Sequence, residues 1–157
     1  MPSRRELIAL SPEEIQEFLE AQKTLIIVSN GRDGYPHPMP MWYYTDADGC
    51  LYCTTFKKAQ KVFNWQRDAK ASLLVESGEE YAELKSVLIY ATAEIIDDID
   101  EVCEALVNIG SKGRTLSADE RQAMKGGMTK TAEKRVLLRF TPQRYVSWDH
   151  AKLGGKY

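Results

Sequence analysis

Short apolar segments separated by polar turns run along most of the chain. They are rich in β-branched, aliphatic and aromatic residues, which favour extended backbone. They predict strands at residues 24–30, 34–44, 50–56, 71–77, 86–97, 134–140 and 144–148. The stretches "NGRDG" and "DADG" are typical of the turns that reverse a chain between neighbouring strands.

Helical signals occur at four places outside these strands. Helices are expected from Ser11, from about Lys58, and over residues 98–110 and 117–125. At the first, Ser11 is a capping residue and Glu14 can complete a capping box. Gly110 is expected to cap the third helix, and Gly126-Gly127 to end the fourth. Thr141-Pro142 is expected to separate the last two strands.

The order of these elements decides the fold class. Strands follow one another with short connections and do not alternate regularly with helices, unlike the pattern of a doubly wound parallel sheet. We therefore expect an α+β protein, in which an antiparallel barrel or strongly curled sheet has helices packed outside it. Because no repeat, linker or low-complexity tract interrupts the chain, we expect residues 1–157 to form one domain.

Prolines occupy every second position of "GYPHPMPMWYY", residues 34–44. In an extended strand, Pro36, Pro38 and Pro40 remove N–H donors from the same edge, while the other edge can still pair. The segment is therefore predicted to be an edge strand. The prolines either only guard that edge against aggregation, or leave room beside the aromatic residues for a flat ligand or a second subunit.

Composition and charge exclude several classes of protein. The chain has 157 residues and a formal charge of −2, which disfavours non-specific nucleic-acid binding. No apolar run is long enough to span a membrane, and the N-terminus lacks the apolar core of a signal peptide. Three cysteines suit a reducing compartment better than a disulfide framework. We expect a cytoplasmic protein.

The stretch "YCTTFKKAQK" combines groups that suit a phosphate. A predicted strand ends in Thr54 and Thr55, and Lys57, Lys58 and Lys61 lie at the start of the following helix. Hydroxyls and helix N–H groups donate hydrogen bonds to an anion, and lysines add positive charge. The alternative is a solvated basic helix end.

The proline segment and the strand at 50–56 are joined by a tight turn, so we expect them to be neighbours. That arrangement would bring the aromatic open flank close to the anion site. A flat aromatic ring with a phosphate tail would satisfy both, and FMN is a common redox cofactor of this kind.

Three blocks of sequence, "GYPHPMPMWY", "LYCTTF" and "KVFNWQRDAKASLLVE", resemble the pyridoxamine 5′-phosphate oxidase-like group of flavin-binding proteins. The resemblance covers residues 11–97 well and the final strands more loosely. It implies a six-stranded split β-barrel and a homodimer with FMN at the subunit interface. It also implies cofactor contacts, with Met39, Pro40, Met41 and Trp42 along the ring, Thr54, Thr55, Lys57 and Lys61 around the ribityl phosphate, and Trp148 reaching the ring from the partner.

Two features depart from the oxidase itself. Gln60 stands where the oxidase carries an arginine, and the C-terminal "SWDHAKLGGKY" lacks the arginine of the oxidase's substrate site. The resemblance therefore implies the scaffold without vitamin B6 oxidation. Similar proteins divide among FMN, deazaflavin and haem, so a flavin-dependent oxidoreductase for a small redox substrate and a non-catalytic cofactor-binding protein both remain open. No catalytic side chain is predicted, because the flavin ring carries out the hydride chemistry.

The remaining cysteines, histidines and acidic residues are expected to have structural roles. In a strand, Cys50 and Cys53 would point to opposite faces, so no metal site is expected there. His37 is expected to be a packing or hydrogen-bonding residue and His150 to be exposed near the C-terminus. The acidic run 97–101 is expected to be a helix N-terminus.

Overall fold

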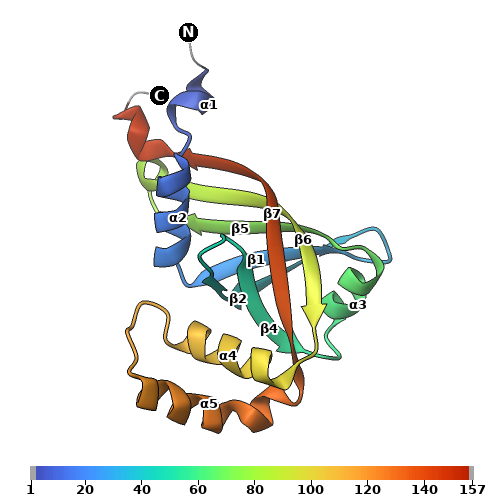
Figure 1. Ribbon diagram of the computed structural model, residues 1–157. Helices are drawn as coiled ribbons and strands as arrows, with labels where there is room; N and C mark the ends of the chain where they lie inside the picture. Colours follow the sequence, from blue (N-terminus) through green and yellow to red (C-terminus); the bar gives the residue numbers. More distant parts are fainter. Residues whose placement is uncertain (1–2, 156–157) are drawn as a thin grey trace.

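Residues 3–155 are described by a computed structural model. Seven strands form one antiparallel sheet in the order β2-β1-β5-β6-β7-β4-β3. The strands are β1 (Thr24–Asn30), β2 (Pro36–Trp42), β3 (Tyr44–Thr45), β4 (Leu51–Phe56), β5 (Lys70–Ser77), β6 (Lys85–Ile96) and β7 (Arg135–Asp149). The long strands β6 and β7 bend, and the sheet curls into a half-barrel (Figure 1).

Helices cover this curled sheet from outside. They are α1 (Arg4–Leu7), α2 (Pro12–Ala21), α3 (Gln60–Arg67), α4 (Ile99–Gly110) and α5 (Ala118–Ala132), with short 3₁₀ turns η1 (Tyr81–Glu83) and η2 (His150–Leu153). α4 and α5 form a hairpin below the sheet in Figure 1, and α3 lies at the side. The predicted α+β class and split-barrel fold are confirmed. The seventh strand is the two-residue β3.

Two of the predicted helix starts are confirmed in atomic detail. Ser11 Oγ accepts a hydrogen bond from the Glu14 N–H at 3.2 Å, and Glu14 Oε2 accepts one from the Ser11 N–H at 2.7 Å. Asp98 caps α4 through the Glu101 N–H at 2.9 Å, as expected for an acidic helix start.

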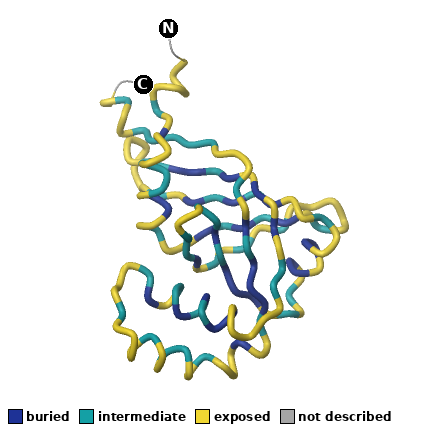
Figure 2. The backbone as a smooth tube through the Cα atoms, viewed as in Figure 1, coloured by how far each residue is buried: buried dark blue, intermediate teal, exposed yellow. Residues whose placement is uncertain are grey.

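Alternate residues of the central strands point into the core. Leu25, Ile27, Leu73, Val87 and Ile89 have no exposed surface. Ile26, Leu74 and Leu88, which alternate with them along the strands, face the opposite side and are half-buried. Figure 2 shows the buried and half-buried stretches alternating in the sheet. Across these central strands the sheet therefore has one filled face and one open face.

The predicted pairing of the proline segment with the strand at 50–56 is wrong. β2 pairs with β1 along its whole length, from Asn30–Pro36 to Thr24–Trp42. Only β3, beyond a break at Tyr43, pairs with β4. The physical reason is the prolines themselves: with one edge disabled, β2 can have a single neighbour, and the hairpin turn gives that place to β1.

The last strand also differs from the prediction. Thr141-Pro142 does not separate two strands, because β7 runs without interruption from Arg135 to Asp149. A register shift opposite Tyr90 and Ala91 absorbs the proline, since a β-bulge tolerates a residue that cannot donate to the ladder.

The predicted helix end at Gly126-Gly127 is wrong as well. α5 continues through both glycines to Ala132, because its contacts with α4 and with the start of β7 outweigh the weak helix propensity of glycine. Gly110 is the last residue of α4, and Ser111 occupies the cap position.

Candidate functional site

β2 is an edge strand, as predicted from its prolines. Its only neighbour in the sheet is β1. Pro36, Pro38 and Pro40 are exposed, and Trp42 at the end of the strand is 69% exposed. The predicted open flank with an aromatic end is therefore present.

The residues expected along a cofactor ring lie on two faces of β2. Pro40 and Trp42 are on the exposed face, whereas Met39 and Met41 are partly buried and pack against the main core. The backbone edge between these side chains is the part of β2 that no other strand covers.

Thr54 and Thr55 lie near the end of β4 and are almost fully buried. Lys61, in the first turn of α3, is only 7% exposed, and its Nζ donates a hydrogen bond to Thr55 Oγ1 at 3.1 Å. Because a buried ammonium normally has an acidic partner, a lysine held only by a hydroxyl is unusual.

The charge of Lys61 is not neutralised by the protein. Among residues 3–155, none of the ion pairs includes this lysine. Burial lowers the pKa of Lys61 most, while Cys53 opposes this shift and the charge of Arg135 adds to it. An anion bound here would therefore meet a desolvated, unpaired cation.

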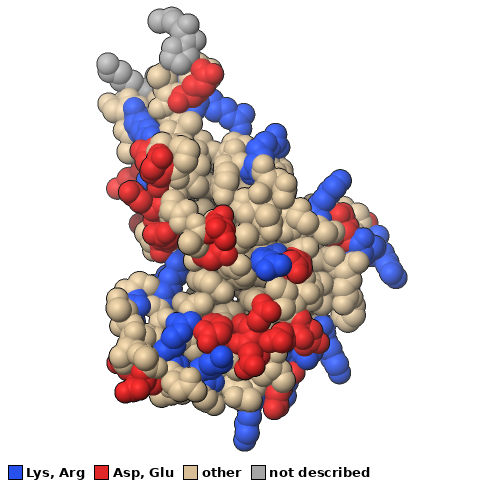
Figure 3. Space-filling view, in the orientation of Figure 1, with Lys and Arg blue, Asp and Glu red and all other residues tan. Residues whose placement is uncertain are grey.

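Unlike Lys61, several charged side chains at the surface form ion pairs. In Figure 3 acidic and basic side chains lie side by side over the hairpin of α4 and α5. Glu104 contributes to this mixture by pairing with both Arg121 and Lys125. Lys57, predicted to bind the same phosphate as Lys61, also has a partner, because its Nζ lies 2.7 Å from Asp97 Oδ1.

Arg135 lies beside Thr54 and was not singled out from the sequence. It opens β7 and pairs in register with Phe56, the last residue of β4. Its Nη1 is 3.4 Å from Thr54 Oγ1 and its Cζ lies 4.4 Å from the centre of the Phe56 ring. Only the pairing of β4 with β7, strands far apart in the sequence, could have revealed it.

A groove of about 410 Å³ joins the proline strand to α3. Tyr35, Pro36 and His37 line one side, and Gln60 and Asn64 line the other. The open strand and the lysine-bearing helix thus meet, although through α3 and not through the predicted contact between β2 and β4.

Asn64 fixes α3 in this position. Its side chain has no exposed surface, donates to Ser29 Oγ at 2.9 Å, and accepts from Gln60 Nε2 at 3.0 Å. Since Asn64 lies one turn after Lys61, this buried hydrogen-bond pair also fixes the direction from which Lys61 reaches Thr55.

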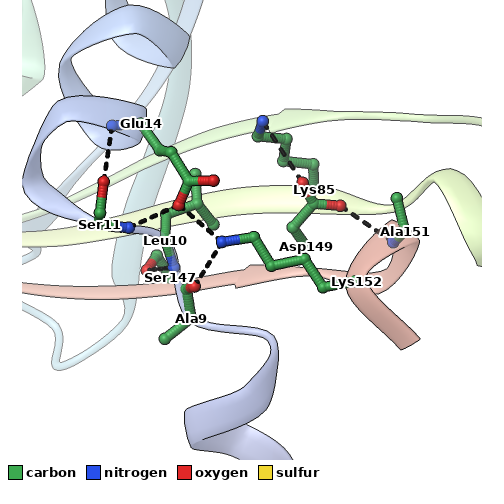
Figure 4. A network of polar contacts seen from close by, with 9 residues as sticks. All are labelled: Ala9, Leu10, Ser11, Glu14, Lys85, Ser147, Asp149, Ala151 and Lys152. Carbon is green, nitrogen blue, oxygen red and sulfur yellow. Dashed lines mark hydrogen bonds and ion pairs between the residues drawn. The ribbon is translucent and has the colours of Figure 1, made fainter. Parts of the chain in front are cut away.

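Trp148 lies at the far end of β7 from Arg135, opposite Ser86 of β6. The same chain therefore does not bring Trp148 to the threonine and lysine site. A network of polar contacts anchors this end of the sheet (Figure 4): Lys152 Nζ reaches Glu14 Oε2 at 2.6 Å, and Ser147 Oγ accepts from the Leu10 N–H at 3.0 Å.

The remaining candidates have structural surroundings. Cys53 is buried in the core whereas Cys50 is half-exposed, and no group of metal-binding side chains occurs within residues 3–155. His37 lines the groove beside α3. His150 is half-buried, contrary to expectation, because its ring lies 2.8 Å from the Tyr81 carbonyl oxygen. No helix in the described part of the chain is long and apolar enough to cross a membrane.

The curled antiparallel sheet, its proline edge strand and its flanking helices together define a protein of the split-barrel fold. The family model described as pyridoxamine 5′-phosphate oxidase matches residues 11–149, and the chain belongs to that family. The comparison with curated proteins gives no match.

Solved structures share the fold of this chain. The chain is 32% identical to the conserved hypothetical protein Rv2991 from Mycobacterium tuberculosis, with a TM-score of 0.85, over 99% of this chain and 95% of that one.

Two more distant structures share the fold and have different functions in their names. An F420 reductase is 18% identical, with a TM-score of 0.60 over 92% of this chain and 98% of that one. HutZ, the haem storage protein from Vibrio cholerae, is 18% identical, with a TM-score of 0.63 over 88% and 96%. The fold alone therefore does not identify the cofactor.

Proposed function

We propose that this protein is an FMN-dependent oxidoreductase that acts on a small redox substrate as a homodimer. The observation that carries the proposal is Lys61, a buried cation without an ion-pair partner that contacts Thr55 and lies on α3, the helix that borders the groove beside the proline strand. A ligand with a phosphate at one end and a flat ring at the other suits this combination.

The residues present fit FMN. Thr54, Thr55 and Lys61 would hold the phosphate, with Lys57 assisting if it leaves Asp97. The open edge from Met39 to Trp42 would lie along the ring, where missing N–H donors allow close approach. When bound, FMN supplies hydride and electron transfer at its ring, and the chain's own residues bind and orient it.

The open face of the sheet supports a dimer. Pro40, Ile26, Leu74, Leu88 and Val146 are aligned in register across five strands, and none of them belongs to the core. A row of apolar side chains of this length is typical of a surface that another protein covers. A second copy of the chain would cover it and would bring the partner's Trp148 to the ring.

The comparisons suggest two alternatives to FMN-dependent catalysis. The F420 reductase shares the fold, and a deazaflavin cofactor also combines a flat ring with a phosphate. The haem storage protein shares the fold too, so a non-catalytic role in cofactor binding is the second function to be tested.

A cytoplasmic location is consistent with three unpaired cysteines.

The absorbance spectrum and mass of the co-purified ligand test this proposal directly. We expect a flavin spectrum with the mass of FMN, reduction of the bound flavin by NADH or NADPH, and turnover on a quinone-like acceptor. A Soret band would indicate that the bound cofactor is haem and not FMN. A deazaflavin spectrum would indicate a deazaflavin cofactor. Tight binding without turnover would indicate a storage or sensing protein.

A further inference from the structure

The open face of the sheet carries a hollow of about 430 Å³ that shares no lining residue with the groove beside α3. Val28, Ser72 and Tyr90 line this hollow and are aligned in register across β1, β5 and β6. Their row lies next to the apolar row that runs from Pro40 to Val146. The hollow therefore borders the face that a second copy of the chain is proposed to cover.

A β-bulge supplies a further polar side chain to the hollow. Tyr90 of β6 pairs with Arg144 of β7, and the next residue of β6 pairs with Pro142. Gln143 is therefore the extra residue of β7, and it lines the hollow. Bulges re-aim single side chains and are over-represented next to functional sites. The irregularity that absorbs the proline thus also adds an amide to this surface.

Unused hydrogen-bond donors gather at one end of the hollow. Lys70 and Thr92 pair in register and both line it, beside Ser72. Within residues 3–155 the hydroxyls of Ser72 and Thr92 make no hydrogen bond, and Lys70 forms no ion pair. Val28 and the Tyr90 ring supply apolar surface. A few convergent polar groups beside an apolar wall are typical of a small-molecule site.

The charges around the hollow favour an anion. Besides Lys70, Arg144 is close, with its Cζ 4.3 Å from the centre of the Tyr90 ring. Among the described residues, Arg144 has no ion-pair partner either. The charge of Lys70 contributes to the lowered pKa of Asp68, but the main cause is a hydrogen bond from Asn30, whose Nδ2 lies 2.8 Å from Asp68 Oδ2. This local excess of positive charge contrasts with the net charge of −2 of the whole chain.

We propose that this hollow is a second binding site, which takes a small aromatic carboxylate. The carboxylate lies at the donors of Lys70, Ser72 and Thr92, since it accepts several hydrogen bonds at once and stays charged at neutral pH. The aromatic ring packs against Tyr90, because aromatic pairs are favourable beyond the area that they bury. The site goes beyond the proposed function and does not depend on a flavin.

Benzoate, benzyl alcohol and acetate are the probes, because the alcohol lacks the charge and acetate lacks the ring. Each is titrated at constant ionic strength into the isotope-labelled protein as purified, with its cofactor, and the backbone amide signals are followed by NMR. We expect benzoate to bind with a Kd on the order of 1 mM and to shift the signals of Ser72, Tyr90 and Thr92. The other two probes should bind at least about threefold more weakly.

Two variants test the two ends of the hollow. Lys70→Gln should weaken benzoate binding by about 2- to 5-fold and leave benzyl alcohol unchanged. Tyr90→Leu should weaken both by about 3- to 10-fold. Lys130→Gln is the matched control: it removes an exposed lysine of α5 and should bind benzoate like the wild type. The amide spectra also show whether each variant is folded.

Three results would overturn the proposal. The first is the absence of benzoate-induced shifts up to about 20 mM. The second is a set of shifts confined to the groove beside α3, since benzoate would then occupy the proposed cofactor site. The third is an equal loss in Lys70→Gln and Lys130→Gln, which would indicate only general attraction between charges. A protein that binds benzoate in the hollow but no flavin would refute the proposed function and leave this site intact.

Discussion

Lys57 and Lys61 come from one basic stretch of sequence, yet their side chains have different surroundings. Lys61 is buried against Thr55 without an acidic partner, whereas Lys57 is paired with Asp97. We expect Lys61→Met to reduce FMN affinity by about 10- to 100-fold and riboflavin affinity little, because only FMN carries the phosphate. Lys57→Met should reduce FMN affinity less than about threefold. Lys57 would have to leave its ion pair with Asp97, and this cost offsets any contact that it makes with the phosphate.

Flavin fluorescence titrations of the two apo-variants provide the measurement. Comparable losses of FMN affinity in both would show that Lys57 leaves Asp97 when the phosphate binds. A loss of riboflavin affinity as large as that of FMN in Lys61→Met would indicate that this lysine only supports the fold.

The residues of the proposed anion site were predictable to the extent that they are close in sequence. Thr54, Thr55 and Lys61 occur within one strand-to-helix junction, so their residue types suggest a shared ligand. Arg135 belongs to a strand more than half the chain away, and sequence spacing contains no information about the register that pairs it with Phe56. The difference between Lys57 and Lys61 depends on Asp97, which lies in the connection between β6 and α4.

At the scale of whole elements, two glycines inside α5 lower the stability of this helix. Gly126 and Gly127 lie inside the helix, and a Cβ added at either would meet nothing within 4 Å. Replacing both by alanine should therefore stabilise the protein by about 1–2 kcal/mol in urea unfolding, because alanine restricts the unfolded chain. Gly113→Ala is the control: its surroundings are equally open, but its φ of +77° should make alanine destabilising.

Lys112, just after α4, joins this part of the chain to the end of α2. Its Nζ donates to the carbonyl oxygens of Leu19, at 2.9 Å, and Gln22, at 2.6 Å, and lies 3.6 Å from the centre of the Tyr43 ring. Burial lowers the pKa of Lys112 to about 8, from an ordinary value of 10.5. Between these values the unfolded chain binds more protons than the folded one, so the contribution of Lys112 to stability increases with pH.

We therefore expect the stability difference between the wild type and Lys112→Met to shift in favour of the wild type from about pH 7 to about pH 9. Paired urea titrations at each pH measure this difference and cancel the effects of the tyrosines and of Cys53, which both proteins share. A difference that stays constant, or shifts the other way, would contradict the lowered pKa.

Elements were predicted better than their pairing. Capping residues and β-branched runs act locally, so the starts of α2 and α4 and the position of β1 follow from the sequence. Pairing depends on more than local sequence: the prolines and the hairpin turn leave β1 as the neighbour of β2, and β4 pairs with β7, which is far away in the sequence. Pro142 and Gly126 were misread for a related reason, because a bulge and helix packing compensated for residues that usually end an element.

At the scale of the whole molecule, the two halves of the expected cofactor site lie at opposite ends of β7. Arg135 begins this strand beside Thr54, and Trp148 is found near its other end. One chain cannot bring them together, so a complete site with Trp148 at the ring requires two chains. A symmetric dimer would then contain two sites, each built from both subunits.

Mixing two damaged subunits tests this arrangement. Lys61→Met removes the phosphate contact and Trp148→Ala the ring contact, so each homodimer should bind FMN weakly at both of its sites. After joint unfolding and refolding at equal concentrations, half of the dimers are mixed, and each mixed dimer has one site with both Lys61 and Trp148 intact. Titration should then reveal wild-type affinity in about a quarter of all sites. If mixing restores no tight sites although tagged subunits show that mixed dimers have formed, Lys61 and Trp148 do not serve one shared site.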